Sequence, residues 1–350
     1  MKKQVFQFLP ALALAAGSML FSGCGKDEEN QVAEREFNNG VFVTNEGQFQ
    51  KSNGDVSAFS KTSKEVEAAV FATINNRPVG DVVQSMAFYD DKAYIVVNNS
   101  AKIEIANART FKSEGVINGL KLPRYMVTTN NKAYVSSWVK ADYTNYTKGE
   151  VAVIDLNTNT ITKTILVGWL PERMLITNNK LFVTNSNDNT VSVIDLASET
   201  VTATITVGDS PNSLALDATG KLWVLGAGNF NALTPSKLQR INTTTNAVET
   251  TVTFPYGSGE DLIVGPDKNT LFFNFGGQVY KMGINETTLP ATPLIDRYFY
   301  GLGIDPETNQ IYGADPGKFD ANGKVIRYNQ AGQVIDSFNV GVIPNDFYFR

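Results

Sequence analysis

Residues 180–196 read KLFVTNSNDNTVSVIDL, a stretch that predicts two short strands joined by a tight turn. Residues 181–185 are apolar and β-branched, and residues 191–196 alternate between apolar and polar side chains, as strands do. Asn187, Asp188 and Asn189 between them are turn formers. Residues 201–207 and 213–216 continue the pattern, so this unit predicts one four-stranded antiparallel blade.

The same pattern recurs along the chain. Related stretches begin at Gly40, Lys92, Lys132, Lys221, Thr270 and Gln310. The second residues of the seven stretches are separated by 52, 40, 48, 41, 49 and 40 positions. A repeat of this length, built only from short strands, is typical of a β-propeller. The sequence therefore predicts an all-β fold, a seven-bladed propeller over residues 40–350, with no long helix.

The two ends of the repeat region indicate how the ring closes. The chain enters at Val41 on a stretch that matches the second strand of a blade. It leaves on residues 344–349, which match the first strand of the unit beginning at Pro211. We therefore expect the C-terminal strand to complete the N-terminal blade, which removes the exposed edges of an open ring.

These repeats resemble the YVTN repeats of YncE-like and surface-layer β-propellers over about residues 40–350. The resemblance implies the propeller fold. It does not by itself imply a function, because this scaffold hosts many functions.

The N-terminal segment reads as a targeting signal. Lys2 and Lys3 precede an apolar stretch that ends in small residues, and Cys24 is the only cysteine of the 350 residues. A membrane-spanning helix fits less well, because polar residues and Pro10 interrupt the apolar run. Residues 20–24 resemble a bacterial lipobox. The interpretation is a signal peptide over residues 1–23 and a lipidated, flexible, acidic tether over residues 24–39, with lipidation at Cys24.

The residues after Cys24, GKDEE, are similar to the signal that exports Bacteroidetes lipoproteins to the cell surface. This resemblance implies an outer-membrane, lipid-anchored protein exposed outside the cell. The net charge of −5 and the lack of a Lys/Arg cluster argue against nucleic acid as a partner.

The loops of the predicted propeller fall into two unequal sets. Loops between strands one and two, and between strands three and four, are short and rich in Asn and Asp, which favours structural turns. The other face carries long loops at residues 45–53, 137–149, 226–236 and 315–323, together with the links between blades. These long loops and links hold most of the loop aromatic residues, and such a gathering indicates a contact surface.

The residues that we expect to bind a ligand all come from this second face. They are Gln48, Phe49, Arg124, Trp138, Tyr143, Tyr146, Trp169, Arg173, Asn229, Phe230, Tyr256, Tyr298 and Tyr300. Phe299 and Arg77 lie in the same links.

The sequence lacks the residues and motifs that are usual in enzymes. The chain has no histidine, and no nucleophile-elbow, zinc-protease or phosphate-loop motif occurs. Carboxylates such as Glu46, Glu172, Glu260 and Asp261 could serve a metal-dependent propeller lactonase, but their spacing does not select that activity. We therefore expect a binding protein, not an enzyme, with no catalytic residue, no metal site and no cofactor.

Length, repeat type and export signal together resemble the BtuG family of Bacteroidetes surface proteins. That resemblance implies capture of cobalamin (vitamin B12) or a related corrinoid, and transfer to a TonB-dependent transporter of the BtuB type. A corrinoid is a large flat macrocycle fringed with amides, which suits Tyr, Trp, Asn and Arg on a wide face. The alternatives are a glycan-binding propeller, a structural surface-layer propeller and, with less support, the lactonase.

Overall fold

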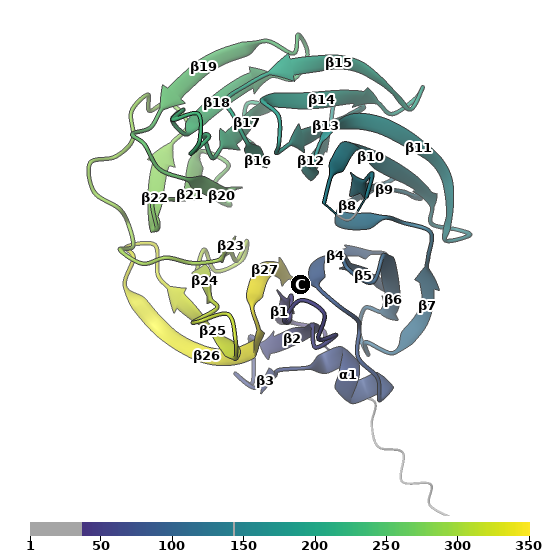
Figure 1. The fold of residues 1–350 in the computed structure, drawn as a ribbon. Helices are drawn as coiled ribbons and strands as arrows, with labels where there is room; N and C mark the ends of the chain where they lie inside the picture. The colour runs from purple at the N-terminus through teal and green to yellow at the C-terminus, as the bar shows by residue number, and fades with distance from the viewer. Residues whose placement is uncertain (1–36, 143) are drawn as a thin grey trace, which may run out of the picture. The chain divides into compact units, whose positions relative to one another are not determined.

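The computed structural model describes residues 37–142 and 144–350, and these form a seven-bladed β-propeller (Figure 1). Each blade is one antiparallel sheet, and the seven sheets follow one another around a central axis. The predicted fold class is therefore confirmed. Cys24, the predicted signal peptide and most of the predicted tether lie outside the described residues, as does Tyr143.

Six blades have four strands each, and the first strand named is the innermost. Blade 1 contains β27 (Pro344–Phe349), β1 (Gly40–Asn45), β2 (Asp55–Ser60) and β3 (Val66–Glu67). Blade 2 contains β4 (Val83–Tyr89), β5 (Lys92–Val97), β6 (Lys102–Asn107) and β7 (Ser113–Ile117). Blade 3 contains β8 (Leu122–Thr129), β9 (Lys132–Lys140), β10 (Tyr146–Asp155) and β11 (Thr160–Trp169). Blade 4 contains β12 (Pro171–Thr177), β13 (Lys180–Asn185), β14 (Thr190–Asp195) and β15 (Thr200–Thr206).

The remaining three blades complete the ring. Blade 5 contains β16 (Pro211–Leu216), β17 (Lys221–Gly226), β18 (Lys237–Asn242) and β19 (Val248–Thr253). Blade 6 has only three strands, β20 (Gly259–Val264), β21 (Thr270–Phe275) and β22 (Gln278–Gly283). Blade 7 contains β23 (Gly301–Ile304), β24 (Ile311–Asp315), β25 (Asn322–Tyr328) and β26 (Val334–Val342).

The hydrophobic core lies between the blades. Seven clusters of buried apolar side chains occur in the described residues, one at each junction of neighbouring blades. On β13, Leu181 and Val183 pack toward blade 3, whereas Phe182 between them packs toward blade 5. A strand buried on both faces needs apolar residues at successive positions. This requirement explains the continuous apolar run at the start of each repeat.

The ring closes through the C-terminal strand, as the sequence predicts. β27 pairs with β1 in antiparallel register, with Phe347 opposite Val43. The inner strand of blade 7 approaches β27 very closely at Gly301. A Cβ atom at this position would lie 1.8 Å from the carbonyl oxygen of Asn345. Glycine on β23 therefore allows the last strand to fit.

Two features depart from the regular repeat. A short helix, α1 (Val70–Asn75), follows β3, and the buried Asp55 carboxylate accepts hydrogen bonds from the N–H groups of Phe71 and Ala72 in its first turn. In blade 6, residues 284–300 take the place of a fourth strand and form no ladder with β22, only an isolated bridge between Ile295 and Val279.

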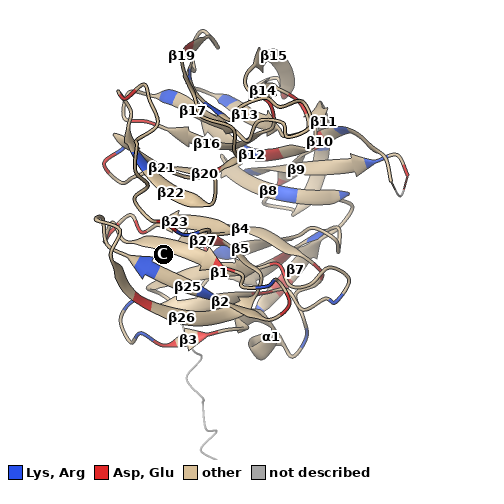
Figure 2. Cartoon of the chain, turned by 60° about the vertical axis from the view of Figure 1, so that its left-hand side comes forward, with Lys and Arg blue, Asp and Glu red and all other residues tan. Residues whose placement is uncertain are grey.

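Charged residues of both signs are interspersed over the blades (Figure 2). The β9–β10 hairpin of blade 3 extends beyond its neighbours in the same view. No helix within the described ranges is long and apolar enough to cross a membrane.

Candidate functional site

A central cavity of about 730 Å³ opens on one face of the propeller, and every blade contributes to its wall. Its lining residues lie in the links between blades, at the beginning of the inner strands, in loops between the second and third strands, and at the paired ends of β9 and β10. We call this side the cavity face, and it is the face on which the sequence places the long loops. The volume falls within the usual range for small-molecule sites.

Many of the polar side chains of the wall come from β-bulges. Six of the seven inner strands shift register against the second strand of their blade close to their first residue. The residues that the regular pairing skips include Gln84, Arg124, Glu172, Asn212, Asp261 and Asn345, and all six line the central cavity. A bulge re-aims a side chain that would otherwise follow the pleat. We call these six residues the bulge set.

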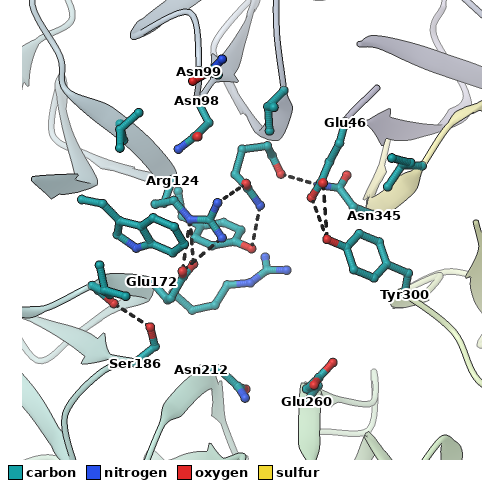
Figure 3. Close-up of a pocket in the computed structure, with 18 of the residues that line it drawn as sticks. Glu46, Asn98, Asn99, Arg124, Glu172, Ser186, Asn212, Glu260, Tyr300 and Asn345 are labelled. Carbon is teal, nitrogen blue, oxygen red and sulfur yellow. Dashed lines mark hydrogen bonds and ion pairs between the residues drawn. The ribbon is translucent and has the colours of Figure 1, made fainter. Parts of the chain in front are cut away.

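Blade 7 is the exception. Its inner strand pairs without a register shift, and the residue just before it, Tyr300, lines the cavity instead. The Tyr300 hydroxyl lies 3.3 Å from both carboxylate oxygens of Glu46, and Asn345 Nδ2 donates to Glu46 Oε1 at 3.1 Å (Figure 3). Burial raises the pKa of the Glu46 carboxyl, and the Arg124 charge and these hydrogen bonds oppose that shift.

Backbone strain gathers beside the bulges. Val82, Leu170, Ser210 and Ile343 precede four of the inner strands, have φ between 49° and 60°, and line the cavity. A β-branched residue such as Val82 or Ile343 rarely adopts positive φ, which costs on the order of 1–3 kcal/mol. The carbonyl of each accepts a backbone hydrogen bond from the loop that follows the second strand of the next blade. Such strain commonly marks binding sites.

Arg124, on β8, is bound on several sides. Its Nε donates to both carboxylate oxygens of Glu172 at 3.1 Å, and its Nη1 donates to Gln84 Oε1 (Figure 3). The guanidinium also lies 4.0 Å from the centroid of the Trp138 ring. Burial raises the pKa of the Glu172 carboxyl, and the Arg124 charge opposes this shift. Arg124 thus joins the inner strands of blades 2, 3 and 4.

Arg173, on β12, lies at the base of the cavity. Its guanidinium stacks on the Tyr125 ring at 4.1 Å, and Nη1 donates to Asp346 Oδ2 at 2.7 Å. Burial raises the pKa of the Tyr125 hydroxyl to about 12. It also raises the pKa of Asp261 to about 7, against the opposing effect of Arg173.

A second, smaller cavity of about 280 Å³ lies next to the base of the first, and we call it the lower chamber. Arg173 and Asp261 line both cavities. The other walls of the lower chamber are mostly apolar and include Leu214, Leu262 and Phe347. The axial space therefore passes from a wide polar cavity to a narrower apolar one.

The structure brings part of the predicted set together. Six of the predicted residues line the central cavity, namely Phe49, Arg124, Trp138, Tyr146, Arg173 and Tyr300. Trp138 and Tyr146 lie in strands β9 and β10, and Arg124 and Arg173 lie in inner strands, not in loops or links as expected. The expected loop over residues 137–149 is shorter because backbone pairing continues to Lys140 and resumes at Tyr146.

Six other predicted residues do not line the central cavity. They are Gln48, Trp169, Asn229, Phe230, Tyr256 and Tyr298. Trp169 lines a separate groove of about 370 Å³ between blades 3 and 4. Phe230 and Tyr256 pack on each other at 5.8 Å and remain 78% and 53% exposed. Phe299, which the sequence places in a link, is fully buried in the core.

Most of the bulge set lies outside the predicted ligand-binding residues. Gln84, Asn212 and Asn345 are not among the predicted residues, and Glu172 and Asp261 are predicted only as carboxylates that could serve a lactonase, yet all five line the cavity. A signal for them exists in the sequence. In four blades a proline followed by a polar residue occupies the first or second position of the inner strand, at Pro123, Pro171, Pro211 and Pro344, whereas Gln84 and Asp261 do not follow a proline.

The chemistry available in the cavity is that of amides, carboxylates, two guanidinium groups, the Lys140 ammonium group and aromatic rings. In the part of the chain that the structure describes, no three His, Cys, Asp or Glu residues are grouped so that they could hold a metal ion.

Fold and cavity together define a seven-bladed β-propeller with a polar axial site. Residues 39–349 match the family described as a domain of unknown function, DUF5074, and the chain belongs to that family. No curated protein matches the chain.

Solved structures share the fold at low sequence identity. A quinonprotein alcohol dehydrogenase-like protein (BT1487) from Bacteroides thetaiotaomicron superposes with a TM-score of 0.66 at 14% identity, over 90% of this chain and 79% of the other. A protein of unknown function from Desulfotomaculum acetoxidans has a TM-score of 0.66 at 13% identity, over 89% and 99%. Hydrazine synthase from Kuenenia stuttgartiensis has a TM-score of 0.57 at 15% identity, over 73% and 85%. At these identities the similarity concerns the fold alone.

Proposed function

We propose that this protein binds cobalamin or a related corrinoid in the central cavity, without chemical conversion. The observation that supports this proposal is the bulge set, six polar residues re-aimed into one cavity by the inner strands of six blades. The repeated irregularity serves no need of the core, because the core lies between the blades. A polar ring with mixed donors and acceptors suits a ligand with many amide groups.

The composition of the wall fits an amide-fringed macrocycle. Amide N–H groups of a ligand can donate to carboxylates such as Glu46 and Glu260, and its carbonyl oxygens can accept from Asn212. Trp138 and Tyr146, whose rings meet edge to face at 5.6 Å, offer an apolar surface for the flat part of the ligand. Because rigid strands hold these groups, little conformational entropy is lost on binding.

The proposed function does not include catalysis. The chain contains no histidine, which is the commonest general base. The Glu172 and Asp346 carboxylates are already paired with Arg124 and Arg173. Carboxylates that form such ion pairs stabilise the structure around the cavity.

We further propose that the protein is exported, lipidated at Cys24 and exposed on the outer membrane, where it passes its ligand to a TonB-dependent transporter. This part rests on the resemblance of residues 20–29 to a lipoprotein signal and of the whole chain to the BtuG family. A nutrient-capturing role explains why a binding protein would carry such a signal.

Isothermal titration of the purified propeller, residues 37–350, with cyanocobalamin tests the proposal. We expect saturable binding of one ligand per chain. The absence of heat at micromolar protein, together with no co-elution of the red ligand in gel filtration, would reject corrinoid binding. Retention on a polysaccharide gel in that case would favour the glycan alternative.

A pair of variants tests the site. Tyr300→Ala removes a cavity residue, whereas Phe230→Ala removes an exposed aromatic residue of the same face outside the cavity. We expect the first to weaken cyanocobalamin binding and the second to leave it unchanged. The reverse result would move the site to the exposed rim.

A further inference from the structure

The two arginines of the central cavity differ in how many of their donors are free. Arg124 uses Nε, Nη1 and Nη2 toward Glu172 and Gln84, and its side chain is only 16% exposed. Arg173 makes one hydrogen bond, from Nη1 to Asp346, and its side chain is 32% exposed. Arg124 therefore stabilises the cavity wall, whereas Arg173 has N–H donors left that can bind a ligand.

Arg173 is also held in a fixed position. Its guanidinium lies 4.1 Å from the Tyr125 ring centroid, and the Tyr125 hydroxyl is in turn 3.3 Å from Gln84 Nε2. A planar guanidinium fixed by stacking and by one carboxylate presents its remaining N–H groups in a set direction. Such a fork matches phosphate or carboxylate oxygens.

The position of Arg173 is distinctive. Among the described residues, Arg173 and Asp261 are the only two that line both the central cavity and the lower chamber. Burial raises the pKa of Asp261 to about 7, so near neutral pH a large fraction of this carboxyl is protonated and can donate a hydrogen bond. The other charged residues that interact with Arg173 or Asp261 are Asp346, which Arg173 already pairs, Glu260, and Glu172, which Arg124 pairs.

We propose that Arg173 binds an anionic phosphate group of the ligand at the junction of the two cavities. This inference rests on the proposed function, and in a cobalamin it assigns Arg173 to the phosphodiester of the nucleotide arm. The lower chamber of about 280 Å³, with its apolar walls, leaves space beyond Arg173 for the apolar base that this phosphodiester carries. The corrin ring then occupies the wider cavity.

Dicyanocobinamide provides the test, because it keeps the corrin ring and amides of cyanocobalamin but lacks the phosphate, the ribose and the base. Titrations of both ligands are compared for the wild type, Arg173→Gln and Arg173→Lys. We expect Arg173→Gln to weaken cyanocobalamin binding roughly 10- to 100-fold, the range for loss of a charged hydrogen bond, and to leave dicyanocobinamide unchanged. Arg173→Lys keeps the charge without the fork and should fall between.

Arg240→Gln is the matched control. Arg240 also lies near an aromatic ring, that of Trp223, and near a carboxylate, that of Glu249, but it does not line either cavity. This variant should leave both ligands unaffected. Unchanged dicyanocobinamide binding in Arg173→Gln also shows that the variant is folded.

The outcomes separate the two claims. If neither corrinoid binds the wild type, the proposed function fails. If both bind and Arg173→Gln weakens them equally, or weakens neither, the phosphate assignment is wrong while corrinoid binding stands. If Arg173→Gln unfolds, the Arg173→Lys comparison decides, and an equal loss for both ligands overturns the assignment.

Discussion

The two faces of the propeller use the same residue types in opposite ways. On the turn face, which carries the loops between strands one and two and between strands three and four, Asp and Asn side chains accept hydrogen bonds from their own loops. Asn107 accepts from the N–H groups of Arg109 and Thr110, and Asp195 accepts from that of Ser198. On the cavity face, the bulged side chains line the cavity and bond to neighbouring blades, as Asn212 does to the carbonyl of Gly259 and Asn345 does to that of Gln84.

The contrast shows that hydrogen-bond partners, not composition, separate a structural residue from a binding residue. An acceptor satisfied by a backbone N–H two or three residues away fixes a turn. A polar group on a bulged strand beside a cavity faces a ligand, and its bonds to the neighbouring blade hold it in position. The following experiments are expected to separate the two faces.

The largest loss of stability is expected on removal of β27, because the closed ring that supports both faces depends on this strand. Deleting residues 345–350 removes most of β27, which supplies Phe347 and the pairing partner of β1. We expect the variant to unfold or aggregate, because the deletion exposes an edge of β1 and opens the ring. A thermal melt checks this, and an unchanged melting temperature would refute the closure.

On the turn face, Asp217→Ala should destabilise the fold and spare binding. The buried Asp217 carboxylate accepts from the N–H groups of Thr219 and Lys221 and from Trp223 Nε1 at 2.9 Å. Its loss leaves a buried indole N–H unpaired, so we expect a decrease of about 3 kcal/mol in the free energy of unfolding in urea. Cyanocobalamin affinity should stay within about twofold, and a larger loss would contradict the separation of the faces.

On the cavity face, Asp261 should make stability depend on pH. Burial raises its folded-state pKa to about 7, above the ordinary value of 3.8. The folded state therefore holds a proton that the unfolded state releases between these values, so stability is present at low pH and lost as pH rises through 7. We expect Asp261→Asn to gain about 2 kcal/mol relative to the wild type between pH 5 and pH 8. Parallel urea curves at both pH values would show that Asp261 is not responsible.

Glu260→Ala should have the opposite signature to Asp217→Ala. Glu260 lines the cavity, and its carboxylate accepts a hydrogen bond from the Ser258 hydroxyl two residues earlier. We expect the free energy of unfolding to change by less than about 0.5 kcal/mol, as at surface sites, and cyanocobalamin affinity to fall roughly fivefold. Full affinity in this variant would remove Glu260 from the site.

The smallest effect is expected at Trp169. This residue lines the groove between blades 3 and 4, and its backbone N–H donates to Asp188 Oδ2. Trp169→Ala should therefore leave cyanocobalamin binding unchanged. Weakened binding would show that the ligand extends over the rim to this groove.

Much of the fold can be predicted from the sequence because each blade repeats one local pattern. Turn residues and the apolar run of the second strand mark every blade, and the final strand matches the pattern that blade 1 lacks. The three-stranded blade 6 and helix α1 could not be predicted, since residues 61–82 and 284–300 lack the repeat and take their positions from tertiary contacts.

The site was harder to predict, for a physical reason. Aromatic residues in long loops predict a contact surface, but exposed loop aromatics such as Phe230 lie on the cavity face without lining the cavity. The bulge set lies in strands. In the sequence, Glu172 and Asn212 look like ordinary polar positions of a strand with alternating polar and apolar residues. Only the register shift against the neighbouring strand, which depends on long-range pairing, turns these side chains inward.

A crystal structure of the protein with cyanocobalamin, phased on the anomalous signal of cobalt, would test the central claim most directly. A single cobalt peak in the central cavity, with the ligand in contact with the bulge set, is the result expected here. A cobalt peak on the turn face or in the groove beside Trp169 would contradict it.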